Sequence, residues 1–76
     1  MSVPPDGVNP IEALSPRETD VLRLVASGRP DAEIAYELVL TQDGVDSYMR
    51  QAMAKLGVET REEAAAIWTA QRRRER

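Results

Sequence analysis

The chain has 76 residues, and this length predicts one small domain. It contains no cysteine and no histidine, which excludes disulfide bonds, thiolate metal sites and the usual general base of enzymes. The remaining carboxylates, hydroxyls and lysine form no recognisable catalytic constellation, so we expect no enzymatic activity and no bound metal or cofactor. No apolar run approaches the roughly 20 residues of a membrane span, and the N-terminus carries no signal segment. We therefore expect a cytoplasmic protein with no membrane contact.

The net charge of −3 is unevenly distributed along the chain. Residues 71–76 contain four arginines and one glutamate, so they carry +3 and residues 1–70 carry −6. Proteins that bind nucleic acid usually present a basic surface. A DNA-binding surface on this chain must therefore be local, or must use the basic tail at 71–76, whose charge also suits the C-terminus of a preceding helix.

Residues 1–13 are expected to form an extended arm or linker, because three prolines and a glycine lie among them. In a larger protein this arm would join the module to another domain. The initial Met1 suits a free-standing small protein equally well.

Capping motifs and glycines mark the ends of the expected helices. Residues 15–18 and 60–63 form two capping boxes, and the first of them has proline at the first helical position. Gly28 and Gly57 suit the C-terminal ends of two helices, and Thr41 is a good N-cap. We expect four helices, over residues 16–27, 31–38, 42–56 and 61–70, with no strand between residues 14 and 70.

Apolar residues recur at helical spacing along these segments, so the helices can share one core. The residues expected in this core are Val21, Leu22, Val25, Ile34, Leu38, Val45, Met49 and Leu56. Only the turn at 39–41 separates the second helix, which Asp31 is expected to cap, from the third. Two helices joined so tightly cross steeply, as in a helix-turn-helix. Periodicity alone leaves a plain four-helix mini-bundle open as the alternative.

Several motifs together resemble the C-terminal DNA-binding domain of the LuxR/NarL family of bacterial transcription regulators. The matching residues are Leu14-Ser15-Pro16-Arg17-Glu18, Gly28, Glu33-Ile34-Ala35, Leu38, Val45 and Lys55-Leu56-Gly57-Val58. Region 4 of sigma factors shares the first half of this pattern, but the run at 55–58 and the capped fourth helix favour LuxR/NarL. The resemblance implies an all-α, four-helix helix-turn-helix domain at 14–70, between the extended arm and the basic tail.

In a helix-turn-helix the recognition helix enters the major groove with its N-terminal residues first. The outward residues there are Gln42, Asp43, Asp46, Ser47 and Arg50, and the resemblance adds Thr41, Tyr48 and Lys55 to the residues expected to bind DNA. By resemblance, family members usually have a basic or polar residue at the Asp43 position and serine or threonine at the Gly44 position. They usually have lysine at the Asp46 position and histidine at the Tyr48 position. This chain departs from the family at all four positions.

The two aspartates make the expected recognition helix unusually acidic. A lysine that faces a phosphate releases a condensed counterion, and it steepens the fall of the logarithm of the DNA-binding constant with the logarithm of the salt concentration, here called the salt slope, by nearly one unit. An aspartate releases no counterion and repels the DNA backbone. Asp43 and Asp46 also suit the positive end of the helix dipole, and Asp46 can pair with Arg50 four residues later. Three interpretations follow: a solvated first turn, an aspartate that accepts a hydrogen bond from cytosine N4, or a helix face that binds a protein.

We expect from this pattern a transcription regulator that binds double-stranded DNA, with weaker general affinity than the family pattern implies. The alternative is a protein-interaction module on the same fold that has lost most DNA affinity and binds a regulator or a polymerase component. By resemblance, the fourth helix is the family's dimer contact, which assigns Ala65, Ala66 and Trp68 to a homodimer interface. Ile67 or Trp68 is also expected to fill part of the core.

Overall fold

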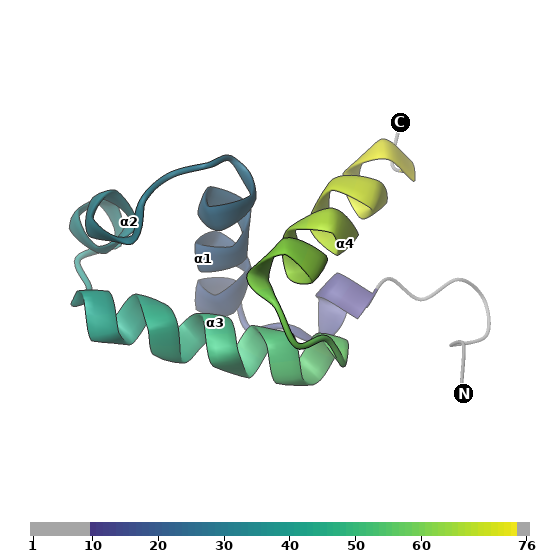
Figure 1. Cartoon of the computed structure of the whole chain (residues 1–76), viewed down its shortest axis with the longest axis horizontal. Coiled ribbons are helices and arrows are strands. Elements are labelled where there is room, and N and C mark those ends of the chain that lie inside the picture. The colour runs from purple at the N-terminus through teal and green to yellow at the C-terminus, as the bar shows by residue number, and fades with distance from the viewer. Residues whose placement is uncertain (1–9, 75–76) are drawn as a thin grey trace.

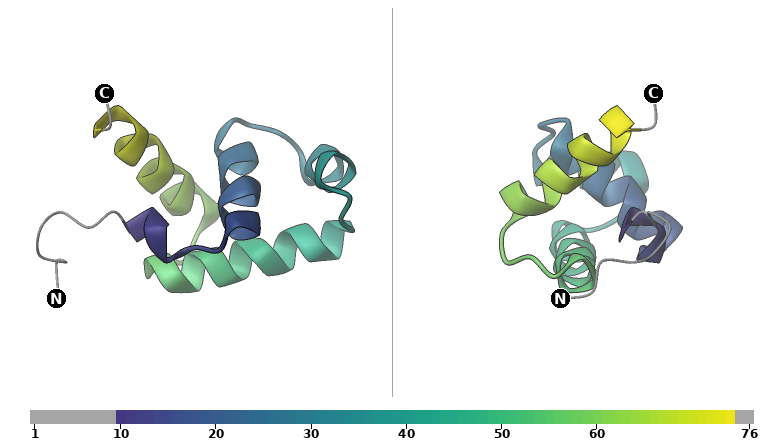
Figure 2. Two further views of the ribbon diagram at one scale, coloured as in Figure 1. Left: turned by 180° about the vertical axis from the view of Figure 1, so that it is seen from behind. Right: turned by 90° about the vertical axis from the view of Figure 1, so that its right-hand side faces the viewer.

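The structure, a computed structural model, describes residues 10–74, with side chains through Arg72. Its elements are a short 3-10 helix η2 (Pro10–Ala13) and the helices α1 (Pro16–Ala26), α2 (Asp31–Leu38), α3 (Gln42–Leu56) and α4 (Arg61–Arg74). The long α3 forms the base, α1 stands on its middle, and α2 and α4 lie on either side of α1 (Figure 1). Figure 2 shows the same arrangement from behind and from the side. The described residues contain no strand, so the predicted all-α class is confirmed.

The turn between α2 and α3 is as tight as predicted. Val39 ends α2 in the left-handed conformation, with φ of 58°, and the Leu40 N–H donates to the Ala35 carbonyl at 2.8 Å. Thr41 then returns to extended backbone, and its Oγ1 accepts from the Gly44 N–H at 2.9 Å. A helix therefore cannot continue through 39–41. The left-handed Val39 was not predicted, because a β-branched residue rarely adopts this conformation.

Both predicted capping boxes are present. The Ser15 hydroxyl accepts from the Glu18 N–H at 3.1 Å, and the Glu18 carboxylate accepts from the Ser15 N–H at 2.8 Å. In the second box, the Thr60 hydroxyl accepts from the Glu63 N–H, and the Glu63 carboxylate accepts from the Thr60 N–H, each at 3.1 Å. These reciprocal bonds satisfy backbone donors that have no partner inside the helix, and they fix where α1 and α4 begin.

The core lies where the four helices meet. Its buried apolar residues are Ile11, Leu14, Val21, Leu22, Leu24, Ile34, Ala35, Val45, Met49, Ala52 and Ala64. Val45 and Met49 are fully buried, as predicted, whereas Val25, Leu38 and Leu56 are only partly buried and pack against its edge. Ile67 and Trp68 also pack there, which confirms that α4 helps to fill the core.

Four boundaries differ from the sequence predictions. The segment Pro10–Ala13 is helical rather than extended, because turning the chain here buries Ile11 and brings Leu14 into the core. The first helix ends at Ala26, one residue early. Pro30, not Asp31, is the N-cap of α2. The last helix continues to Arg74 instead of ending at 70, since no glycine or proline stops it.

Residues 1–9 of the predicted arm and residues 75–76 of the predicted tail lie outside the described residues. Within the described part, no helix is both long and apolar enough to cross a membrane. The Arg72 guanidinium lies 5.9 Å from the centroid of the Trp68 ring, a cation–π contact that favours the extra turn of α4.

Candidate DNA-binding surface

The solvent-facing side of α3 lies opposite its buried stripe of Val45, Met49 and Ala52. At about 100° per residue, the residues that point away from this stripe are Asp43, Ser47, Arg50, Gln51 and Ala54. We call these five residues the outward face of α3. The sequence prediction concentrated on the first two turns and therefore omitted Gln51 and Ala54, which are both exposed.

The first turn of α3 presents polar groups to solvent. Thr41, Gln42 and Asp43 are all exposed. The oxygen of the Thr41 hydroxyl caps the helix by accepting from the Gly44 N–H, and its hydroxyl proton can still donate. Asp43 forms no ion pair with the part of the chain that the structure describes. This turn therefore offers hydrogen-bonding groups but no cation.

Four charged residues from three helices form a continuous chain of ion pairs, which we call the charge network: Asp31, Arg61, Asp46 and Arg50. Arg50 Nε lies 3.1 Å from Asp46 Oδ2, as the four-residue spacing predicted. Arg61 Nη2 lies 3.3 Å from Asp46 Oδ1. The two terminal nitrogens of Arg61 also hold Asp31 in a fork, at 2.7 and 3.0 Å. The charge network thus joins the starts of α2 and α4 to the second turn of α3.

Arg61 was not predicted to take part in the site. Hydrogen bonding to Asp31 raises the pKa of the Arg61 guanidinium, and the contact with Asp46 raises it further. Partial burial lowers this pKa, but the two carboxylates outweigh it, so the pKa lies above its ordinary value. One feature of the sequence could have indicated such a partner: Arg61 is the first residue of α4, where the helix dipole disfavours a cation. Because both oxygens of Asp46 already accept from arginines, a contact with cytosine N4 would have to share an engaged oxygen.

Lys55 points its charge toward α1. Its Nζ lies 2.8 Å from Glu18 Oε1, and the Glu18 side chain is only 3% exposed. Burial raises the pKa of Glu18, but hydrogen bonds from Lys55 and from the backbone and hydroxyl of Ser15 outweigh it, so the pKa lies below its ordinary value. Lys55 therefore compensates a buried carboxylate, and its role in DNA binding stays a prediction.

Tyr48 is half-buried and packs against the core, so it lies off the outward face of α3. Ser47 and Arg50 do lie on this face. Of the eight residues predicted to bind DNA, the structure thus brings Asp43, Ser47 and Arg50 together on the outward face, and it leaves Thr41 and Gln42 exposed at the N-terminal end of α3. Contact between Tyr48 and DNA stays a prediction.

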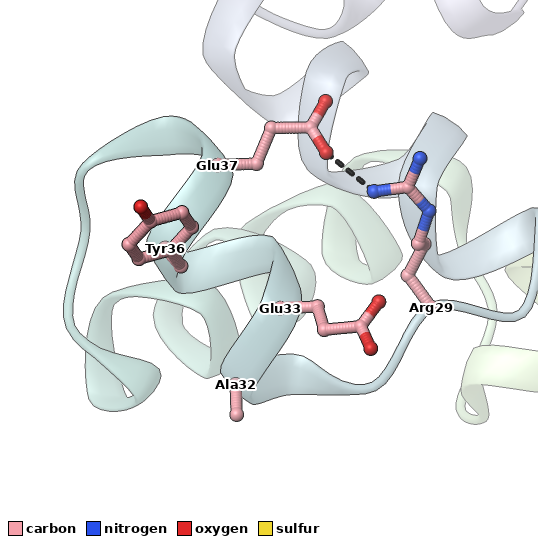
Figure 3. Close-up of a pocket in the computed structure, with 5 residues that line it drawn as sticks. All are labelled: Arg29, Ala32, Glu33, Tyr36 and Glu37. Carbon is pink, nitrogen blue, oxygen red and sulfur yellow. Dashed lines mark hydrogen bonds and ion pairs between the residues drawn. The ribbon is translucent and has the colours of Figure 1, made fainter.

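A second exposed surface covers the outer side of α2. Tyr36 and Val39 are each 89% exposed, and a shallow hollow beside Tyr36 is lined by Arg29, Ala32, Glu33 and Glu37. Figure 3 shows the Arg29–Glu37 ion pair across this hollow from the Tyr36 ring. Exposed apolar side chains with a charged rim are typical of protein contacts.

A comparison with protein families identifies the family of this chain. The profile described as "Bacterial regulatory proteins, luxR family" matches residues 12–68. The chain belongs to this family. The match confirms the resemblance found in the sequence, and it identifies a family of regulators rather than of enzymes. The mini-bundle and the sigma-factor alternatives are accordingly set aside.

Curated bacterial regulators are similar over most of this chain. The nitrate/nitrite response regulator protein NarL of Escherichia coli K12 is 36% identical over 63 residues, which cover 83% of this chain and 29% of that protein. The HTH-type transcriptional activator RamA of Corynebacterium glutamicum is 44% identical over 62 residues, covering 82% and 22%. The DNA-binding transcriptional activator DevR/DosR of Mycobacterium tuberculosis is 33% identical over 61 residues, covering 80% and 28%. The chain spans less than a third of the length of these relatives.

Proposed function

We propose that this chain is the DNA-binding module of a transcription regulator, with α3 as the recognition helix in the major groove. The observation that carries the proposal is the exposed outward face of α3, presented by a tight helix-turn-helix in a chain of the LuxR family. The relatives named as transcriptional activators support the same role. A helix-turn-helix places the N-terminal residues of such a helix against base edges.

The charges on α3 favour weak general affinity for DNA. Asp43 and Asp46 balance Arg50 and Lys55, so this helix has no net charge. Of its two cations, Arg50 is paired with Asp46 and Lys55 with Glu18. Since the salt slope grows with the number of phosphates that cations neutralise, we expect a shallow salt dependence and specificity that depends on hydrogen bonds from the outward face.

The first test titrates the chain against a labelled duplex at two salt concentrations. Ser47→Glu puts a negative charge in the middle of the outward face and should weaken binding about tenfold or more, because a lost contact costs roughly 1–3 kcal/mol before repulsion. The control is Ala13→Glu, which adds the same charge at an exposed position on η2, near the opposite end of α3 from Thr41 (Figure 1). Equal effects of the two variants would remove α3 from the DNA surface.

One observation favours the second candidate, a protein-interaction module that binds a regulator or polymerase component. The outer side of α2 leaves Tyr36 and Val39 almost fully exposed, and a solvated tyrosine beside a valine gains free energy when a partner covers both. If this candidate holds, the parent chain will bind no duplex even at low salt. Binding of the parent to a duplex would favour the DNA-binding proposal.

We further propose that any homodimer forms through α4. Ala66 is exposed, whereas Ala65 and Trp68 are half-buried, so Ala66 is the residue of the predicted contact that a second copy could reach most closely. Ala66→Glu should convert a dimer to monomer in sedimentation experiments, because an isologous interface would bring two new carboxylates together. Ala32→Glu on α2 is the control. A dimer that Ala66→Glu leaves intact would contradict the proposal, and a monomeric parent would remove it altogether.

A further inference from the structure

Two guanidinium groups converge on one carboxylate beside the recognition helix. Arg50 of α3 and Arg61 of α4 contact opposite oxygens of Asp46, at 3.1 and 3.3 Å. The planar donors of arginine match the oxygens of a carboxylate and those of a phosphate in the same way. Two arginines that are positioned to bind a carboxylate are therefore also positioned to bind a phosphate at the same point.

We propose that Arg50 and Arg61 form a binding site for a phosphate of the DNA backbone, and that Asp46 occupies this site from within the chain. The inference rests on the proposed function and deepens it, because it assigns a second helix, α4, to DNA contact. The site is open: the side chains of Arg50, Asp46 and Arg61 are 71%, 50% and 33% exposed. A phosphodiester beside α3 can therefore reach both arginines.

Asp31 keeps this site in place independently of Asp46. It holds both terminal nitrogens of Arg61, so Arg61 stays at the start of α4 when Asp46 is changed. The pairs with Asp46 are solvent-exposed, and exposed ion pairs contribute at most about 1 kcal/mol to stability. Loss of the Asp46 charge should thus open the site without unfolding the domain.

The test compares Asp46→Asn with Asp43→Asn in the full chain. Both variants remove one negative charge from the first two turns of α3, but only Asp46 holds arginines. DNA affinity is measured by fluorescence anisotropy with a random duplex over several salt concentrations. Asp46→Asn should steepen the salt slope by about one unit, the contribution of the counterion that one neutralised phosphate releases. Asp43→Asn should change it much less. Asparagine is used because a lysine at 46 would lie against the Arg61 guanidinium, and Asp46→Ser repeats the test if asparagine disturbs the helix.

A double variant tests whether Arg61 is part of the site. When Arg61→Gln is added to Asp46→Asn, it should abolish most of the increase in salt slope that Asp46→Asn causes. Arg61→Gln alone should change the salt slope of the parent little. Equal gains from Asp46→Asn and Asp43→Asn, or a gain that survives Arg61→Gln, would overturn the proposal. If the parent binds no duplex but Asp46→Asn does, the site stands and the proposed function fails for the native chain. If no variant binds at low salt, both fail.

Discussion

Replacing Val45 with aspartate should unfold the domain. Val45 is fully buried in α3, and it belongs to the apolar core that the helices share. Burial of an unpaired carboxylate costs several kcal/mol. Small domains are held by about 5–15 kcal/mol in total, and a chain of 76 residues is expected near the lower end of this range.

Thermal unfolding followed by circular dichroism measures the effect. The matched control is Gln51→Asp, which places the same side chain on the exposed outward face of the same helix. Gln51→Asp should melt within a few degrees of the parent, whereas Val45→Asp should show no cooperative transition under the same conditions. A Val45→Asp protein that melted close to the parent would mean that α3 buries a different face.

The elements of this fold were predictable where the determining contacts are local. The capping box at 15–18 joins residues three positions apart, and Thr41 caps α3 through a residue three positions away. The positions of Gly28 and Gly57 also agree with their observed left-handed backbone, with φ of 90° and 74°. Such contacts depend only on neighbouring residues, so a sequence pattern contains all the information that they need.

The candidate site was less predictable because its contacts join distant parts of the chain. Arg61 pairs with Asp31 across 30 positions and with Asp46 across 15. The sequence assigned Asp46 to DNA or to its neighbour Arg50, and only the packing of α4 beside α3 brings in Arg61. Glu18 was expected to cap α1, but its pairing with Lys55 spans 37 positions. Local patterns cannot show which of several charges a folded chain brings together.

Removal of the Lys55 charge should destabilise the domain at neutral pH. Lys55→Met keeps much of the side-chain length but leaves the buried Glu18 carboxylate without its cation. Breaking a fully buried pair costs about 3–5 kcal/mol; since Lys55 itself is 43% exposed, we expect a smaller loss of roughly 1–3 kcal/mol. Urea unfolding of parent and variant at pH 7 measures this difference.

The difference should shrink as the pH falls, because it depends on the charge of Glu18. The pKa of Glu18 is lowered in the folded chain, so the stability it contributes is present above the unfolded pKa of about 4.3 and is lost as the pH falls through the folded pKa. Once Glu18 is protonated, Lys55 has no carboxylate to compensate, and the stabilities of parent and Lys55→Met should converge. Glu18→Gln combined with Lys55→Met is the control, and its stability relative to Glu18→Gln alone should hardly vary between pH 7 and about pH 3. If the loss caused by Lys55→Met were the same at both pH values, it would have to arise from lost side-chain packing rather than from the ion pair with Glu18.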